Sequence, residues 1–236
     1  GFIAAGTAAQ DNYQVARSYL SEQIREDWNP NYSVLIQSGE PDISVVSNNT
    51  ASYAVPIIDS VDEWGRYLGA TAVTEQALEF RFVRELGEWR LSALPDGIVL
   101  SESAFSEAFN SFRLYYFSSG YRDLVADVRW FATRGEVSAK IVRALLQAPS
   151  FWLDQGSTVS AFPEGTQLAL TPIPVVDGVA AVDLTTQVLS ADEITRSRML
   201  AQLTASLGQV QGISSAKISV NQNELVIPPL GEQGPS

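Results

Sequence analysis

The chain has 236 residues, of which 45% are hydrophobic and 18% are charged, a composition typical of globular rather than disordered proteins. Its 27 acidic and 15 basic residues give a net charge of −12, which argues against nucleic acid as a partner. The sequence has no cysteine and no histidine, and this excludes disulfides, thiol nucleophiles, Ser-His triads and zinc sites built from these residues. No uncharged stretch holds the roughly 20 apolar residues that a bilayer crossing needs.

The first predicted element is a helix over residues 11–28. Asp11 followed by Gln14 is typical of a capping box, and Asn29-Pro30 marks the end because a residue before proline leaves the helical region. Apolar residues recur at three- and four-residue steps and form one stripe: Tyr13, Ala16, Leu20, Ile24 and Trp28.

Strands follow the helix. Residues 32–37, 43–47 and 52–58 are rich in β-branched and aromatic residues, and two alternating runs around 86–88 predict a long antiparallel hairpin. Trp89 alternates with Arg90, so we expect Trp89 in the core. A helix packed on a curved antiparallel sheet gives an α+β first domain.

The second half has its own pattern of elements. It predicts strands at 114–117, 167–170, 217–220 and 225–227, and a helix over 137–146 that ends at Pro149. Asp177-Gly178 between valines indicates a type I′ hairpin. Ser190 with Glu193 predicts the cap of a last helix that runs to Gly208. Net charge also differs, at −9 for residues 1–119 and −3 for residues 120–236, which supports two small α+β domains.

Ordered blocks of residues resemble a known family. Residues 16–20, 28–30 and 89–98 are similar to the N-terminal region of the actinobacterial LpqB lipoproteins, which implies an NTF2-like domain. Blocks that include 114–117, 127–130, 161–166 and 177–184 then resemble the GerMN domain found in the same family. Ala148-Pro149 and residues 221–223 depart from the pattern where glycine is expected.

The resemblance implies a domain division into 1–112 (NTF2-like), 113–227 (GerMN) and 228–236, a linker towards a C-terminal β-propeller. It also implies a fragment of an extracytoplasmic lipoprotein, anchored to the cell membrane through a lipidated cysteine that this chain does not contain. The expected function is that of a non-enzymatic accessory partner, without cofactor, which contacts the ectodomain of a two-component sensor histidine kinase (MtrB-type) in cell-envelope homeostasis.

Two alternatives stay open. One is a small-molecule receptor or enzyme that uses the cone of the NTF2-like domain, and the other is a structural spacer for the propeller. The aromatic residues that either line such a cone or fill the core are Tyr13, Tyr19, Trp28, Tyr53 and Trp64.

Enzyme motifs are nearly absent, and the sequence predicts no catalytic, cofactor-binding or metal-binding residue. It lacks a P-loop, a dinucleotide fingerprint and a nucleophile elbow. Ser214 and Lys217 have the spacing of a Ser-x-x-Lys dyad, but the lysine runs into an alternating strand, so we interpret the segment as a strand-entry loop. Asp127 and Arg129 are interpreted as a structural ion pair.

Acid pairs are interpreted as solvated rather than as calcium ligands. We expect four of these acids to be exposed and free to steer a positively charged partner: Glu26, Asp27, Asp62 and Glu63.

Overall fold

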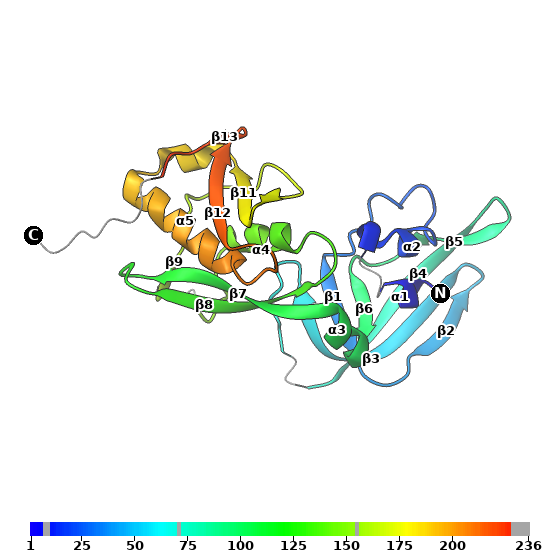
Figure 1. The fold of residues 1–236 in the computed structure, drawn as a ribbon. Helices are drawn as coiled ribbons and strands as arrows, with labels where there is room; N and C mark the ends of the chain where they lie inside the picture. Colours follow the sequence, from blue (N-terminus) through cyan, green and yellow to red (C-terminus); the bar gives the residue numbers. More distant parts are fainter. Residues whose placement is uncertain (7–9, 70–71, 154–155, 228–236) are drawn as a thin grey trace, which may run out of the picture. The chain divides into compact units, whose positions relative to one another are not determined.

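The computed structural model describes residues 1–6, 10–69, 72–153 and 156–227 (Figure 1). The chain divides into two compact units. The first comprises residues 1–110 together with 132–135, and the second comprises 111–131 and the residues from 136 onward. The predicted linker at 228–236 lies outside the described residues. The predicted boundary after residue 112 falls within a continuous strand, β7, and stays a prediction.

The first unit is built mainly of strands. Its strands are β1 (Ser33–Gln37), β2 (Asp42–Ser47), β3 (Thr50–Asp62), β4 (Thr74–Glu85), β5 (Glu88–Ala93) and β6 (Ile98–Ser101). Its helices are α1 (Phe2–Ala5), a 3-10 turn η1 (Gln10–Tyr13), α2 (Gln14–Arg17) and α3 (Glu102–Ala108). The sheet order is β5-β4-β3-β1-β6, with β2 also paired to β3. The sheet is antiparallel, as predicted, apart from the parallel pairing of β1 with β6.

The predicted helix over 11–28 is wrong beyond its first turns. Helix α2 ends at Arg17, and the chain then runs beside β5: Leu91 N donates to Tyr19 O at 2.9 Å, and Ser21 N donates to Leu91 O at 2.7 Å. These bonds satisfy backbone groups at the edge of β5, which a continuous helix would leave unpaired. The Asp11 side chain, the predicted cap, lies outside the described residues.

Most of the apolar stripe is nevertheless buried, although the helix is not formed. The residues of the stripe with an exposure of 3% or less are Tyr13, Ala16, Leu20 and Trp28. The periodicity therefore identified core residues correctly while their backbone adopts a shorter helix and turns.

The predicted hairpin is confirmed as β4 and β5, joined at Leu86 and Gly87, which both have positive φ. The expectation that Trp89 is a core residue is wrong: its side chain is 52% exposed, whereas Leu91 on the same strand is 4% exposed. Residues 19–21 bond to β5 at Leu91. The Trp89 ring, close to the turn, instead lies 5.3 Å from the Arg84 guanidinium.

In its described residues, the second unit combines two small sheets with two α-helices and a short 3-10 helix. Its strands are β7 (Phe109–Ser118), β8 (Leu124–Ala132), β9 (Thr158–Val159), β10 (Val175–Val176), β11 (Val179–Leu184), β12 (Ser215–Val220) and β13 (Asn223–Glu224). Its helices are α4 (Val137–Leu145), a 3-10 helix η2 (Thr186–Ser190) and α5 (Glu193–Leu207). The sheet orders are β10-β11-β12-β13 and β8-β7-β9. The prediction of two small α+β domains is confirmed.

Local predictions in the second unit have mixed outcomes. The β10–β11 turn has φ values of 51° at Asp177 and 78° at Gly178, as a type I′ turn requires. Ser190 does not cap α5. Its hydroxyl donates to Gln187 O, and Asp192 is the cap, with Oδ1 accepting from Thr195 N at 2.8 Å.

Two of the predicted strands are wrong. Within 167–170 only Leu168 forms an isolated bridge, to Leu184, and residues 225–227 are not a strand, although Leu225 N donates to Ile218 O of β12 at 2.9 Å.

The ion pair expected at Asp127 and Arg129 is present and fully buried. Arg129 Nη2 donates to Asp127 Oδ2 at 2.6 Å, and Ser150 donates to the same carboxylate through its backbone N and its hydroxyl, each at 2.8 Å. These bonds join β8 to the segment after α4, so the pair has a structural role.

Candidate functional site

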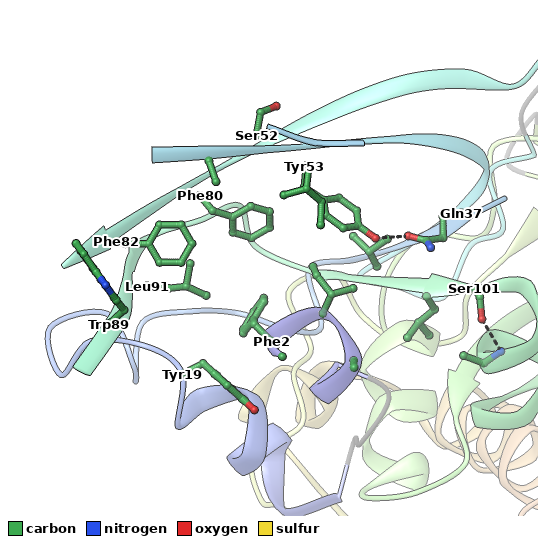
Figure 2. A pocket seen from close by; sticks show the side chains of 18 residues that line it. Phe2, Tyr19, Gln37, Ser52, Tyr53, Phe80, Phe82, Trp89, Leu91 and Ser101 are labelled. Atoms are coloured by element: carbon green, nitrogen blue, oxygen red, sulfur yellow. Dashed lines mark hydrogen bonds between the residues drawn. The ribbon is translucent and has the colours of Figure 1, made fainter. Parts of the chain in front are cut away.

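The first unit contains a cavity of about 610 Å³ on the inner face of its sheet (Figure 2). Strands β3 to β6 and helix α1 contribute most of its walls. The larger side chains that line it are Phe2, Tyr53, Phe80, Phe82, Trp89 and Leu91.

Strand alternation produces this wall. On β4 the inward residues Phe80 and Phe82 pair with Ala51 of β3 and Leu91 of β5, respectively. A methyl side chain opposite an aromatic ring leaves space above the sheet, since successive residues alternate between its two faces. The cavity therefore follows from the order of large and small residues along neighbouring strands.

Polar groups gather at one end of the cavity. Figure 2 shows Phe82 and Trp89 at one end and Gln37 and Ser101 at the other. The Tyr53 hydroxyl donates to Gln37 Oε1 at 2.7 Å, and burial raises the pKa of Tyr53 above its ordinary value. Among the described residues that line the cavity, none has a charged side chain.

The five predicted aromatics divide between cavity and core. Tyr19 and Tyr53 line the cavity. Tyr13 and Trp28 are each 3% exposed and pack edge to face, with centroids 6.3 Å apart, and burial raises the pKa of Tyr13 to about 12. Trp64 is not among the lining residues.

Several lining residues were not predicted from the sequence. Phe80, Phe82 and Leu91 were placed on the predicted hairpin but were not assigned to a cavity, although their alternation was visible. Phe2 gave no signal, because all four residues of α1 are apolar and so short a helix has no periodicity that shows which residue faces the sheet.

The Ser-x-x-Lys spacing does not form a dyad. Lys217 Nζ pairs with Glu224 Oε2 at 3.0 Å, and the Ser214 hydroxyl donates to Gly178 O at 3.2 Å. The chemistry of a serine nucleophile needs a base beside the hydroxyl, and neither bond supplies one.

The structure places three of the four expected steering acids on the surface. Glu26, Asp27 and Glu63 are exposed. The expectation for Asp62 is wrong: its carboxylate is half-buried, accepts from Trp64 N and Arg66 N, and pairs with the Arg66 guanidinium at 3.5 Å. Asp62 therefore holds the turn after β3.

The described residues form neither a metal site nor a membrane-spanning helix. Within the parts of the chain that the structure describes, no three acidic side chains converge as metal ligands would. In the same parts, every helix is too short or too polar to cross a bilayer.

Comparisons with known proteins cover nearly the whole chain. Residues 1–106 match the family described as "Lipoprotein LpqB, N-terminal domain", and residues 113–226 match "Sporulation and spore germination". The chain is 25% identical to lipoprotein LpqB of Bifidobacterium longum, over 84% of this chain and 36% of that protein. It is 26% identical to the LpqB of Cutibacterium acnes, over 98% of this chain and 39% of that protein.

The chain thus spans well under half the length of these relatives. Among solved structures, the tandem GerMN domains of the sporulation protein GerM from Bacillus subtilis align with a TM-score of 0.42 and 17% identity, over 55% of this chain and 45% of that one. The two family matches follow one another along the sequence, and the relatives share both regions. The chain therefore belongs to the LpqB lipoprotein family.

Proposed function

We propose that this chain is the extracytoplasmic part of a membrane-anchored lipoprotein that acts as a non-enzymatic regulatory partner of a two-component sensor histidine kinase (MtrB-type). Membership of the LpqB family supports the lipoprotein assignment, since the relatives carry that name. The lipid anchor, the position outside the cytoplasm and the role in cell-envelope signalling are parts of the proposal.

The observation that carries a protein-binding role is the exposed edge strand β2. Among the strands that the structure describes, β2 pairs with β3 alone, and all six of its residues are exposed. Ile43, Val45 and Val46 are 66%, 81% and 62% exposed. Apart from Asp42 at its start, β2 carries no charged residue or proline, and these are the residues that usually keep an edge strand from pairing with other strands.

Such an edge fits a partner that adds an extended segment to the sheet. Main-chain hydrogen bonds along β2 would supply the affinity, and alternate side chains of the added strand would supply the specificity. The occupant that we propose is a strand from the extracytoplasmic domain of the kinase.

Surface plasmon resonance between the chain and the kinase ectodomain tests the proposal. We expect Val45→Lys to weaken binding at least tenfold, because it puts a charge in the pairing edge. The matched control is Val176→Lys, on the two-residue strand β10 of the second unit, where the valine is 67% exposed. This control should bind as the unaltered chain does.

Either of two results would contradict the proposal. If the unaltered chain fails to bind the ectodomain, the partnership is wrong and the spacer alternative gains support. If Val45→Lys binds normally, β2 is not the interface.

A further inference from the structure

We infer that the cavity of the first unit binds one molecule of an uncharged single-chain lipid ester, with its chain along the aromatic wall and its carbonyl group at Gln37. The inference depends only on the cavity and is independent of the proposed kinase partner. It assigns a ligand class to the cavity, which shares one residue, Ile43, with the proposed pairing edge β2.

The size and the lining of the cavity favour a flexible apolar molecule. A volume of about 610 Å³ lies within the ~300–1,000 Å³ that small-molecule sites usually have. The wall is formed by aromatic and aliphatic side chains, and burying apolar surface against such a wall contributes about 25 cal/mol per Å².

A ligand can enter the cavity at its edge, where apolar lining residues are exposed to solvent. Ile43, Trp89 and Tyr19 line the cavity and are 66%, 52% and 39% exposed. Exposed apolar side chains that lie together, rather than singly, usually mark a binding surface or a ligand-binding groove. A ligand that covers the Trp89 ring would explain why this residue is not packed into the core.

The polar end of the cavity favours a ligand that has an oxygen atom able to accept a hydrogen bond. Gln37 Oε1 accepts from the Tyr53 hydroxyl, and this fixes the orientation of the amide. The amide nitrogen then remains to donate, since a glutamine side chain has two N–H donors on that atom. An ester or ketone oxygen fits this donor, and a hydrocarbon without oxygen leaves it unused.

Charge excludes the anionic members of the same lipid class. Residues 1–119 carry 16 acids and 7 bases, and the lining itself offers no cation on a side chain to pair with a carboxylate. Burying an unpaired charge in an apolar site is strongly unfavourable. A neutral ester should therefore bind more tightly than the fatty acid with the same chain.

Displacement of N-phenyl-1-naphthylamine, an uncharged fluorescent probe, tests the inference. The competitors are methyl oleate, 1-monooleoylglycerol and oleate, which share one chain and differ in the head group. We expect both esters to displace the probe at concentrations at least tenfold lower than oleate. The amino group of Gly1 is acetylated in a parallel sample, because Gly1 lines the cavity and a free amine would attract oleate.

Two alanines of β3 give a matched pair of variants. Ala51 lines the cavity, and Ala54, three residues further along, belongs to the opposite face of the strand. Ala51→Trp should fill the cavity and abolish displacement by the esters, while Ala54→Trp should leave it unchanged. Circular dichroism and the melting temperature of each variant report whether it folds.

A second variant tests the polar end and does not depend on filling the cavity. Gln37→Glu keeps an acceptor for the Tyr53 hydroxyl but replaces the amide donor with a carboxylate oxygen. We expect ester affinity to fall roughly fivefold to tenfold, the loss of one hydrogen bond.

Three outcomes would overturn the inference: no ester displaces the probe, oleate matches the esters in the acetylated chain, or Gln37→Glu leaves ester binding intact. If Ala51→Trp does not fold, the head-group series and Gln37→Glu still decide the result. Kinase binding is measured separately, so failure here leaves the proposed partner untouched.

Discussion

Trp89 and Leu91 occupy the same strand and line the same cavity, yet their exposures are 52% and 4%. Alternation with Arg90 identified the inward face of β5 correctly but gave no information about depth. How deeply a side chain of β5 is buried depends on residues 19–21, which bond to β5 at Leu91 and come from a distant part of the sequence. A pattern within one strand does not contain that contact.

This difference predicts unequal costs for two truncations on one strand. Trp89→Ala should lower the free energy of unfolding by at most about 1 kcal/mol, the value of a surface residue with a cation–π contact. Leu91→Ala should lower it by about 2–5 kcal/mol, as for other buried leucines. Urea unfolding of both variants measures the two costs, and equal costs would show that Trp89 is packed as tightly as Leu91.

At the scale of elements, those with local signals were easier to predict than those that depend on distant contacts. The hairpin of β4 and β5 and the turn at Asp177-Gly178 depend on local turn chemistry, which the sequence displays. The helix expected over 11–28 fails because its hydrogen bonds compete with those to the edge of β5, a long-range effect. The cavity could not be predicted for the same reason, because its wall forms only when several strands are paired in register.

The start of α5 is the element where pH should matter most clearly. Hydrogen bonds from the Thr195 hydroxyl and backbone N lower the pKa of Asp192 below its ordinary value. A carboxyl group whose folded pKa is lowered stabilises the fold fully above the unfolded pKa, and this stabilisation is lost as the pH falls through the folded pKa. The effect of Asp192 should therefore be complete at neutral pH and vanish in acid.

Melting temperatures of Asp192→Ala and Asp192→Asn at neutral pH and near pH 3 measure this effect. The alanine variant should melt lower than the unaltered chain at neutral pH, with a difference that shrinks in acid. The asparagine variant should keep most of the cap at both, because its amide oxygen also accepts from the helix. A difference for the alanine variant that does not change with pH would contradict the role of the carboxylate.

At the scale of the whole molecule, negative charge is concentrated in residues 1–119, and the fold exposes several of these acids to solvent. Three acids near the ends of turns, Glu26, Asp27 and Glu63, are exposed, and a surface of one sign mainly raises the association rate with an oppositely charged partner. The Asp62 carboxylate instead holds a turn, and the sequence alone does not distinguish it from Glu63, the acid beside it.

If these acids steer the kinase ectodomain, association should slow several-fold as salt rises from about 50 to 500 mM, where the Debye length falls to roughly 4 Å. Replacing Glu26, Asp27 and Glu63 together with their amides should reproduce that slowing at low salt and leave the dissociation rate nearly unchanged. Stopped-flow or surface plasmon resonance resolves the two rates. Association that does not depend on salt would mean that these acids serve solubility alone.

Residues 132–135 belong to the first unit although the chain on both sides of them belongs to the second. Thr133 stabilises this passage of the chain back into the first unit. It donates to Ala108 O through its backbone N at 2.9 Å and through its hydroxyl at 3.2 Å. The polypeptide therefore changes unit after residues 110, 131 and 135, and no single recombination point divides it into two complete parts. Gene shuffling that exchanged one half alone would remove a piece of the other, so this pair of units is expected to be inherited together.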